Sequence, residues 1–343
     1  MEFNEKFIEE TNQVIDDCQV FSDRCIMRDG FVFTAIHHPA NVYNAIIVKQ
    51  PNNIPCFSPR VKDSERSLAE HIELINTYKI ERAYIIANNI DFITQCPDLK
   101  HIYIVPFEFE GNGFDYSPLY KMTGLKSVGC PTIYGRNAEF KTTIDYSQII
   151  GIESIGVSNS GDKNYQNIKT LKSLGITSYK GTDLTNVFSS TILDTLIISQ
   201  CKIKSLEGLQ KSEKMQCLYL WYNRSLQDIT ALRKVKKTLR TLRIQNCPKI
   251  TDFSVLAELE NLELLELTGS NTLPSLDFIK SMKNLKTFTF NMNVLDGDLS
   301  PCLNLSYVYS ERNRKHYNLK DSQMPRGEYV RGNESIDIWR RLP

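Results

Sequence analysis

The residues that usually carry enzyme chemistry are scattered in this sequence of 343 residues. The one histidine cluster is His37-His38, and neighbouring residues of a strand point to opposite faces, which favours a surface or hairpin role over a metal site. HExxH, CxxC and glycine-rich phosphate loops are absent from the sequence, and GVSNSG around Ser158 lacks the GxSxG spacing of a hydrolase nucleophile. The sequence therefore predicts no catalytic residues, no metal, no cofactor and no enzyme activity.

A second group of residues is suited to recognition. The stretch MQCLYLWYNRSLQDI contains Tyr219, Trp221 and Tyr222, and arginines follow shortly after it. Tyr, Trp and Arg dominate the binding energy of protein interfaces. We therefore predict a partner-binding face, and its candidate residues are Tyr219, Trp221, Tyr222, Arg240, Arg243, Gln245, Glu266 and Asn291. In the alternative, these aromatic residues only pack on one another or against the N-terminal part of the chain.

Composition narrows the class of partner. Forty-one basic and forty acidic residues leave a net charge of +1, so no overall charge attracts nucleic acid or an anionic membrane. Nine cysteines without CxxC pairs are typical of reduced thiols. The acidic N-terminus lacks the features of a secretion signal, and no run of about 18 apolar residues occurs. We expect a cytoplasmic monomer that binds a protein, not nucleic acid or membrane.

A repeat positions the candidate residues. Apolar residues recur at offsets 0, 3 and 5 of a frame, with Asn or Cys at offset 8, as in Met215, Leu218, Leu220 and Asn223. The frame steps by 20 to 24 residues from Leu171 onward and less regularly before it. The leading positions are Ile80, Leu99, Leu125, Ile152, Leu171, Leu193, Met215, Leu239, Leu262, Leu285 and Leu305.

The spacing of the frame predicts which side chains are buried. Offsets 3 and 5 lie on one face of a strand, and stacked repeats share the core that this face enters. Tyr219 and Trp221 then point outward onto the opposite face, with Tyr222 at its edge. The polar residue at offset 8 is expected to satisfy backbone groups in the next turn, and examples are Asn88, Cys201, Asn223, Cys247 and Asn293.

The pattern LxxLxLxx(N/C)xL resembles the signature of leucine-rich repeat proteins, and its period of about 22 residues is similar to the bacterial internalin-type class. This resemblance implies an α/β fold, a leucine-rich repeat solenoid with a curved parallel sheet and a short 3-10 or irregular convex side. Residues 80–313 would form about 11 repeats, residues 1–79 an N-terminal α/β capping subdomain, and residues 314–343 a C-terminal cap or tail.

The flanking segments give further expectations. Residues 1–17 are amphipathic and predict a short helix, and two strands are expected around Asp29-Gly30, a common hairpin signal. Another strand is expected in YNAIIVKQP, followed by a helix with Ser64 as its N-cap and Ser67 as the less favoured choice. We expect Tyr317 and Trp339 to cover the last coil.

Two function classes fit this resemblance. The first is a non-catalytic module that binds a protein through its concave face, which includes cytosolic proteins that neutralise a toxin. The second is a secreted or cell-surface adhesin or effector similar to internalins. Some secreted repeat proteins are ubiquitin ligases with a Cys-x-Asp nucleophile, but Cys96 to Asp98 lies in a repeat turn, and we do not expect the large helical catalytic domain of that family here. Gly129, Gly156 and Gly175 form an outward column that either relieves crowding or lets a partner approach.

Overall fold

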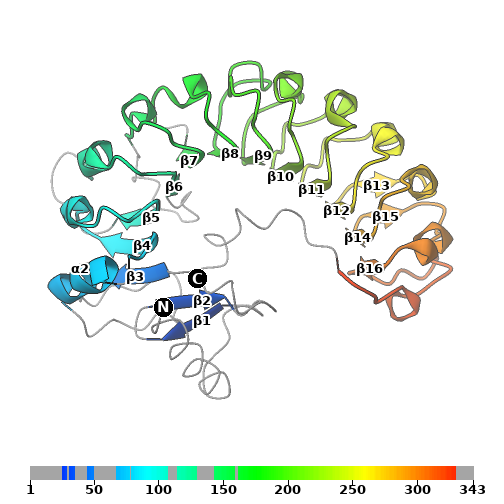
Figure 1. The fold of residues 1–343 in the computed structure, drawn as a ribbon. Helices are drawn as coiled ribbons and strands as arrows, with labels where there is room; N and C mark the ends of the chain where they lie inside the picture. The colour runs from blue at the N-terminus through cyan, green and yellow to red at the C-terminus, as the bar shows by residue number, and fades with distance from the viewer. Residues whose placement is uncertain are drawn as a thin grey trace. The chain divides into compact units, whose positions relative to one another are not determined.

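The computed structural model describes residues 25–28, 31–34, 45–49, 67–77, 79–106, 114–129, 143–158 and 161–329. The chain divides into two compact units, residues 1–156 with 335–343 and residues 157–334, and each is described by itself (Figure 1). The predicted helix at 1–17, Ser64 and Trp339 lie outside the described residues. The predicted domain boundaries at residues 79 and 313 stay predictions.

The first unit begins with the predicted hairpin. Strands β1 (Cys25–Arg28) and β2 (Phe31–Thr34) pair antiparallel, with Cys25 opposite Thr34. Strand β3 (Ala45–Lys49), also predicted, pairs antiparallel with β2 and parallel with β4 (Arg82–Ala87). The sheet therefore changes from antiparallel to parallel at β3, where the repeats begin.

Helix α2 (Leu68–Thr77) connects β3 to β4. It starts with a reciprocal cap: the Ser67 hydroxyl accepts a hydrogen bond from the Glu70 amide at 3.3 Å, and the Glu70 carboxylate accepts one from the Ser67 amide at 2.6 Å. Ser67, the less favoured choice, is thus the N-cap, because a glutamate stands three residues after it, whereas a serine stands three residues after Ser64. Ile75 is fully buried on the inner face of the helix.

The repeat frame is confirmed along the chain. In every repeat the strand begins two residues after the predicted leading position, and that leading residue is at most 9% exposed. In the first unit the strands after β4 are β5 (His101–Pro106), β6 (Ser127–Gly129) and β7 (Ser154–Ser158), whose last two residues already belong to the second unit. In the second unit they are β8 (Ser173–Thr177), β9 (Thr195–Ser199), β10 (Cys217–Trp221), β11 (Thr241–Gln245), β12 (Leu264–Thr268), β14 (Thr287–Phe290) and β16 (Tyr307–Ser310).

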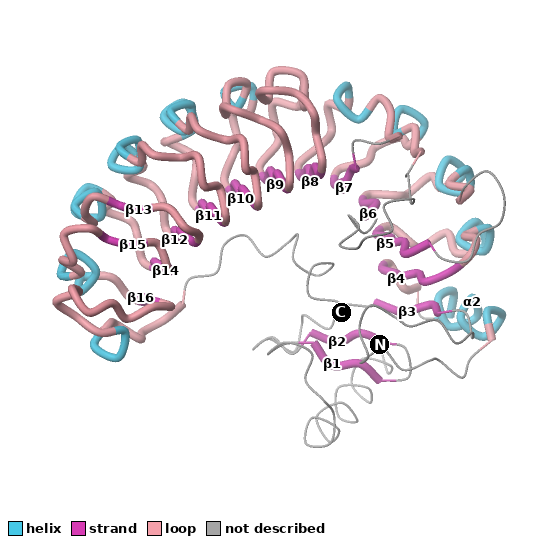
Figure 2. Tube along the Cα trace, turned by 180° about the vertical axis from the view of Figure 1, so that it is seen from behind, coloured by secondary structure: helices cyan, strands magenta, loops and turns pink. Residues whose placement is uncertain are grey.

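The strands of the second unit form one parallel sheet in the order β8-β9-β10-β11-β12-β14-β16 (Figure 2). A small parallel pair, β13 (Thr272–Leu273) with β15 (Asn293–Val294), lies beside it. The offset-3 residues pair across neighbouring strands and are fully buried, forming a continuous apolar column: Leu174, Leu196, Leu218, Leu242, Leu265, Phe288 and Val308. No single repeat could bury these side chains alone.

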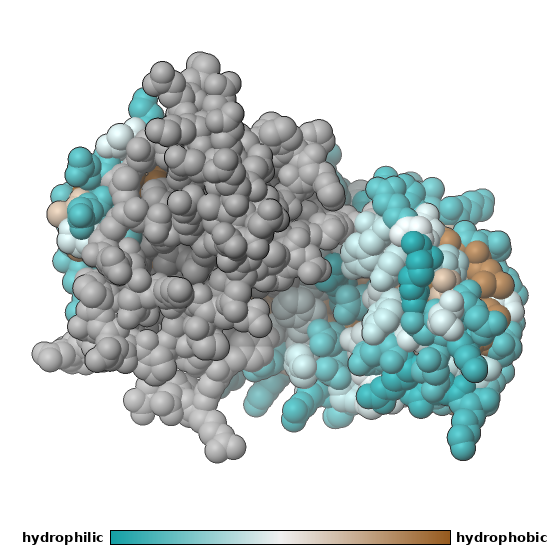
Figure 3. All heavy atoms as spheres, turned by 90° about the horizontal axis from the view of Figure 1, so that it is seen from below, coloured by the Kyte–Doolittle hydropathy of each residue, from teal (hydrophilic) through white to brown (hydrophobic). Residues whose placement is uncertain are grey.

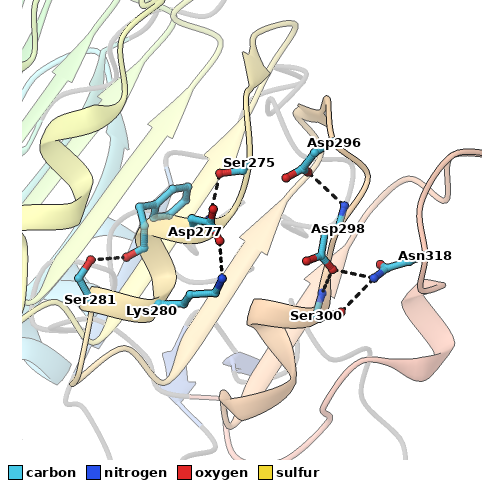
Figure 4. Close-up of polar contacts among 9 residues, drawn as sticks. Ser275, Asp277, Lys280, Ser281, Asp296, Asp298, Ser300 and Asn318 are labelled. Carbon is cyan, nitrogen blue, oxygen red and sulfur yellow. Dashed lines mark hydrogen bonds and ion pairs between the residues drawn. The ribbon is translucent and has the colours of Figure 1, made fainter.

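The coils return through short 3-10 turns opposite the strands, except the coil between β8 and β9, which returns through turns and bends alone (Figures 1 and 2). The turns are η3 (Asp91–Gln95), η4 (Ser117–Lys121), η5 (Tyr146–Gln148), η6 (Tyr165–Asn167), η7 (Leu209–Lys211), η8 (Thr230–Val235), η9 (Ser254–Glu258), η10 (Asp277–Ser281), η11 (Ser300–Asn304) and η12 (Asp321–Gln323). An aspartate or serine two residues upstream caps several of them. The Ser300 amide donates to Asp298 Oδ1 at 2.9 Å and the Asp277 amide to Ser275 Oγ at 3.2 Å (Figure 4). Hydrogen bonds from Ser300 lower the pKa of Asp298.

The last strand of the second unit is covered by the chain that follows it. The Val308 amide donates to the Pro325 carbonyl at 3.0 Å, and the Gly327 amide donates to the Ser306 carbonyl at 2.8 Å. The Tyr317 hydroxyl, expected to cover the last coil, accepts from the Val294 amide at 3.0 Å. Residues 317–327 thereby satisfy an edge that would otherwise pair with another chain.

Within the described ranges, no helix is long and apolar enough to cross a membrane. The described residues also contain no group of three or more His, Cys, Asp or Glu side chains that could hold a metal ion.

We predict that the buried thiols resist modification in the folded protein. Cys96, Cys201, Cys217, Cys247 and Cys302 are buried, and burial raises the pKa of Cys201 to about 11 and that of Cys302 to about 12. Because the thiolate is the reactive form, iodoacetamide at neutral pH should leave these five unmodified until urea unfolds the chain. Mass spectrometry of the alkylated peptides measures this, and rapid labelling of any of the five in the native protein would contradict it.

Candidate protein-binding face

The predicted outward columns are confirmed by the strand register. Tyr219 lies between Ile197 and Arg243 on neighbouring strands, and Trp221 lies opposite Gln245. One strand further, Glu266 pairs with Arg243 and Thr268 with Gln245. The face opposite the apolar column therefore brings together the aromatic and charged candidates of three successive coils.

Tyr219 is less accessible than expected. Only 3% of it is exposed, although it belongs to the outward column. Its ring stacks on that of Trp221, with centroids 6.2 Å apart and planes at 9°, and the Arg243 guanidinium carbon lies 5.2 Å from the Tyr219 centroid. Tyr219 therefore packs against Trp221 and Arg243, and its direct contact with a partner stays a prediction.

Arg243 and Glu266 form a half-buried ion pair. Their Nε and Oε2 atoms are 3.7 Å apart, and the side chains are 25% and 21% exposed. Burial raises the pKa of Glu266, while the charge of Arg243 acts to lower it. Arg243→Glu would place two carboxylates side by side here, so that variant is expected to lose stability as well as binding and cannot isolate a binding role.

Tyr222 occupies an unusual backbone position. Its φ is +53°, and the residue just after the strand is left-handed in the neighbouring coils too, where it is Ser178, Gln200, Asn246 or Gly269. The position is needed for coil-to-coil bonding, because the Tyr222 amide donates to the Gln245 carbonyl at 2.8 Å and the Asn246 amide to Thr268 at 2.8 Å. Left-handed backbone costs an L-residue about 1–2 kcal/mol, and a bulky aromatic residue is a rare occupant.

Tyr222 is also one of few large apolar side chains that face solvent. The surface seen in Figure 3 is mostly hydrophilic where it is described. The exposed large hydrophobic residues of the described ranges are Ile150, Ile192, Tyr222, Leu295, Leu303 and Tyr309, with Tyr222 at 39%. Trp221, beside Tyr222, is half-buried. Trp221 and Tyr222 thus form the apolar part of the candidate face.

Two candidates lie apart from this group. Arg240 stands just before the start of β11, whereas Tyr222 follows the end of the neighbouring strand β10. The Arg240 Nη1 donates to the Asn261 carbonyl at 3.1 Å. Asn291 links the coils on either side of it: its Oδ1 accepts from the Gly269 amide at 2.7 Å and its Nδ2 donates to the Glu311 carboxylate at 2.6 Å. The structure therefore gives Arg240 and Asn291 roles between coils, and gathers Trp221, Tyr222, Arg243, Gln245 and Glu266.

The polar residue at offset 8 anchors the turns as predicted. Asn223 is fully buried; its Oδ1 accepts from the Cys201 amide at 2.9 Å, and its Nδ2 donates to the Ile198 carbonyl at 2.9 Å. The Cys201 and Cys247 thiols each donate to a carbonyl of the preceding coil, 3.7 Å away in both cases. These residues are structural, and their side chains are not available to a ligand.

One member of that set differs from the prediction, and one further coil takes its anchor from a position outside the set. Asn88 is exposed and accepts from the Asn89 side chain, so it does not act as a buried anchor. In the coil led by Leu262 the anchor is Asn271, whose Nδ2 donates to the Cys247 and Ile250 carbonyls at 3.0 and 2.7 Å. Asn271 stands one position later than offset 8 because the left-handed Gly269 begins a longer turn. The Gly-x-Asn sequence at residues 269–271 could have indicated this shift.

The glycine column separates into two cases. A Cβ at Gly129 would lie 2.5 Å from the ring of Tyr103, its neighbour across the sheet, so glycine there makes room for an aromatic ring. A Cβ at Gly156 would meet nothing within 4 Å. Crowding therefore accounts for Gly129 and does not account for Gly156.

Comparison with known proteins gives the fold. No family model matches the sequence, and no curated protein matches it. Among solved structures, an internalin, InlF of Listeria monocytogenes, matches with a TM-score of 0.50 and 18% identity over 76% of this chain and 77% of that chain. The TLR13–ssRNA13 complex matches with a TM-score of 0.46 and 15% identity over 71% of this chain and 45% of that one. At these identities the similarity concerns the fold alone.

Proposed function

We propose, from the leucine-rich repeat solenoid fold of this chain, that it is a non-catalytic module that binds a protein partner through the strand face of the coils led by Met215, Leu239 and Leu262. The partner would contact Trp221 and Tyr222 and the polar residues beside them. Stacked coils give such a face a rigid backbone, which lowers the entropy lost on binding.

The observation that carries this proposal is the conformation of Tyr222. Asn and Gly, which tolerate left-handed backbone, fill the same position in the next two coils. Stability alone would favour either of them at residue 222. A strained, exposed aromatic side chain next to a half-buried tryptophan is better explained by an interface, where both residue types supply much of the binding energy.

For the setting of this function we propose a cytoplasmic protein that acts as a monomer without nucleic-acid or membrane partners. The free, buried thiols of Cys96, Cys201, Cys247 and Cys302 support a reducing compartment. An immunity-type role, in which the partner is a toxin, is the specific form we favour, and it rests on the resemblance of the repeats. A secreted or surface adhesin is the second candidate. Rescue of growth by co-expression with the captured partner would distinguish them.

We predict that Tyr222→Asn weakens partner binding by about tenfold or more without loss of stability. Asparagine accepts the left-handed backbone, so the free energy of unfolding should stay the same or rise by up to about 1 kcal/mol. The partner is first captured from a lysate of the native organism by wild type, and its affinity for both proteins is then measured by titration calorimetry alongside urea unfolding.

The matched control is Tyr309→Asn. Tyr309 is similarly exposed, at 44%, but it lies within β16 in ordinary strand conformation, in the last coil. This variant should keep the affinity of wild type and gain no stability. If Tyr222→Asn binds as wild type does, the proposed face is wrong; if it unfolds more easily, Tyr222 belongs to the structure instead.

A further inference from the structure

A strip of exposed basic side chains follows the strand ends of four successive coils. We name it the basic flank, and its members are Lys180, Lys202, Lys204, Arg224 and Lys249. They stand at offsets 9 to 11, just beyond the left-handed residue of each coil. The segments 178–182, 200–204, 222–226 and 246–250 contain no Asp or Glu.

The charges of the basic flank are unpaired, whereas several other cations of these coils form ion pairs. Within the described part of the chain, none of its five members forms an ion pair. On the same coils, Arg233 pairs with Glu258 at 3.1 Å, Arg240 with Glu263 at 3.8 Å and Arg243 with Glu266. Like charges in neighbouring coils repel one another, and an anionic ligand would relieve that repulsion.

The backbone under the flank is fixed. The Lys202 amide donates to the Tyr179 carbonyl at 2.8 Å, and the Lys204 amide donates to the Thr182 carbonyl at 2.7 Å. The Gln227 amide donates to the Lys204 carbonyl at 3.0 Å in turn. These bonds fix the backbone of Lys202 and Lys204 to the coils on either side, whose strands are about 4.8 Å apart. The flank therefore places basic residues on successive, closely spaced coils.

Acidic residues delimit the row. Asp183, Glu207, Asp228 and Asp252 follow it on the turns of the same four coils. Asp162 precedes it in the coil led by Ile152, and Asp296 follows it in the coil led by Leu285. The cationic strip is therefore about four coils long and narrow, and a wide polyanion would meet carboxylates along one side.

We propose that the basic flank binds an acidic segment of the protein partner, so that the partner spans Trp221 and Tyr222 on the strand face and the flank beside them. This inference rests on the proposed function. Tyr222 joins the two surfaces, because the Arg224 amide donates to the Tyr222 carbonyl at 3.0 Å. A row of cations met by carboxylates would accelerate association and make it sensitive to salt.

The ligand chemistry favours a peptide over a nucleic acid. Proteins that bind single strands use several aromatic side chains on which successive bases stack, whereas Tyr222 is the one large exposed aromatic residue that the described coils place beside the flank. The acidic residues of the adjoining turns would repel a phosphate backbone that strayed from the strip. An extended acidic peptide is narrow enough to follow the row alone.

The test removes the charge while leaving the fold intact. In the full-length chain, Lys202→Gln, Lys204→Gln and Arg224→Gln are combined, since all three side chains are exposed and unpaired. The matched control combines Lys234→Gln, Lys237→Gln and Lys283→Gln, which removes the same charge from exposed lysines elsewhere on the coils. The probes are a fluorescent oligoglutamate peptide and a fluorescent oligothymidylate, followed by anisotropy at about 50 mM and about 200 mM salt.

We expect wild type and the control to bind oligoglutamate equally, and the flank variant to bind it about tenfold or more weakly at the lower salt concentration. Tyr222→Asn should retain oligoglutamate binding while losing the partner, which separates this inference from the proposed function. Equal loss in the control, no binding by wild type, or tighter binding of oligothymidylate that displaces the peptide would each overturn the assignment. The last result would assign the flank to nucleic acid.

Discussion

Replacing Asn223 with alanine is expected to lower the free energy of unfolding by about 2 to 5 kcal/mol, because two buried backbone groups each lose a partner worth about 1 to 3 kcal/mol. These groups are the Cys201 amide and the Ile198 carbonyl, both hydrogen-bonded at 2.9 Å. Asn223 itself is fully buried, so water cannot replace the lost bonds without opening the turn. Urea unfolding followed by circular dichroism measures the change.

The neighbouring coils supply a graded control. Cys201 and Cys247 occupy the position of Asn223 and donate from their thiols to a carbonyl, but a thiol is a poor acceptor for an amide. Asn223→Cys should therefore cost less than Asn223→Ala and more than nothing. Asn304→Ala, at an exposed asparagine in η11, should be nearly neutral. If the free energy of unfolding of Asn223→Ala stays within about 0.5 kcal/mol of wild type, the hydrogen bonds of the Asn223 side chain are not needed for stability.

The repeat frame made most of the second unit predictable. An error in placing one strand would displace its side chains relative to those of both neighbouring strands. The eleven repeats therefore fix one another's strand positions. The register that places Leu218, Leu242 and Leu265 in one buried column was predicted in this way. The same frame predicted which candidates share the outward face, since Tyr219, Arg243 and Glu266 pair in sequence.

The repeat frame does not predict how far a side chain extends or which neighbouring groups it contacts. Tyr219 has the outward offset, yet stacking with Trp221 and the approach of Arg243 bury it. Arg240 and Asn291 were grouped with the candidates by residue type, but their hydrogen bonds join neighbouring coils. Asn271 was missed because the turn at Gly269 is longer than the frame allows.

The two flanks of the sheet differ in how their charges are used. On the flank where strands begin, several charges pair from coil to coil: Lys126 with Glu153 at 3.1 Å in the first unit, and Arg240 with Glu263 at 3.8 Å in the second. Exposed pairs of this kind contribute little stability, but they neutralise the surface. On the flank where strands end, Lys202 and its neighbours have no such partners. This asymmetry is expected if one flank is structural and the other meets a partner.

Leu242→Ala is expected to lower the free energy of unfolding by about 2 to 5 kcal/mol, since it opens a cavity that rigid coils cannot collapse. Leu242 is fully buried between Leu218 and Leu265 in the middle of the apolar column. Gln245→Ala, at the outward end of the same strand, should change stability by no more than about 0.5 kcal/mol. Both variants are compared with wild type by urea unfolding.

A second substitution tests whether the column acts as one core. Leu218 and Leu242 are neighbours across β10 and β11, so their cavities would merge in the double alanine variant. The combined loss should differ from the sum of the single losses by about 0.5 to 3 kcal/mol, because the sites share contacts. Additive losses would mean that each coil packs independently. Coupling would show that the rigidity assumed for the binding face comes from packing between coils, which is also what holds Tyr222 in its strained, exposed position.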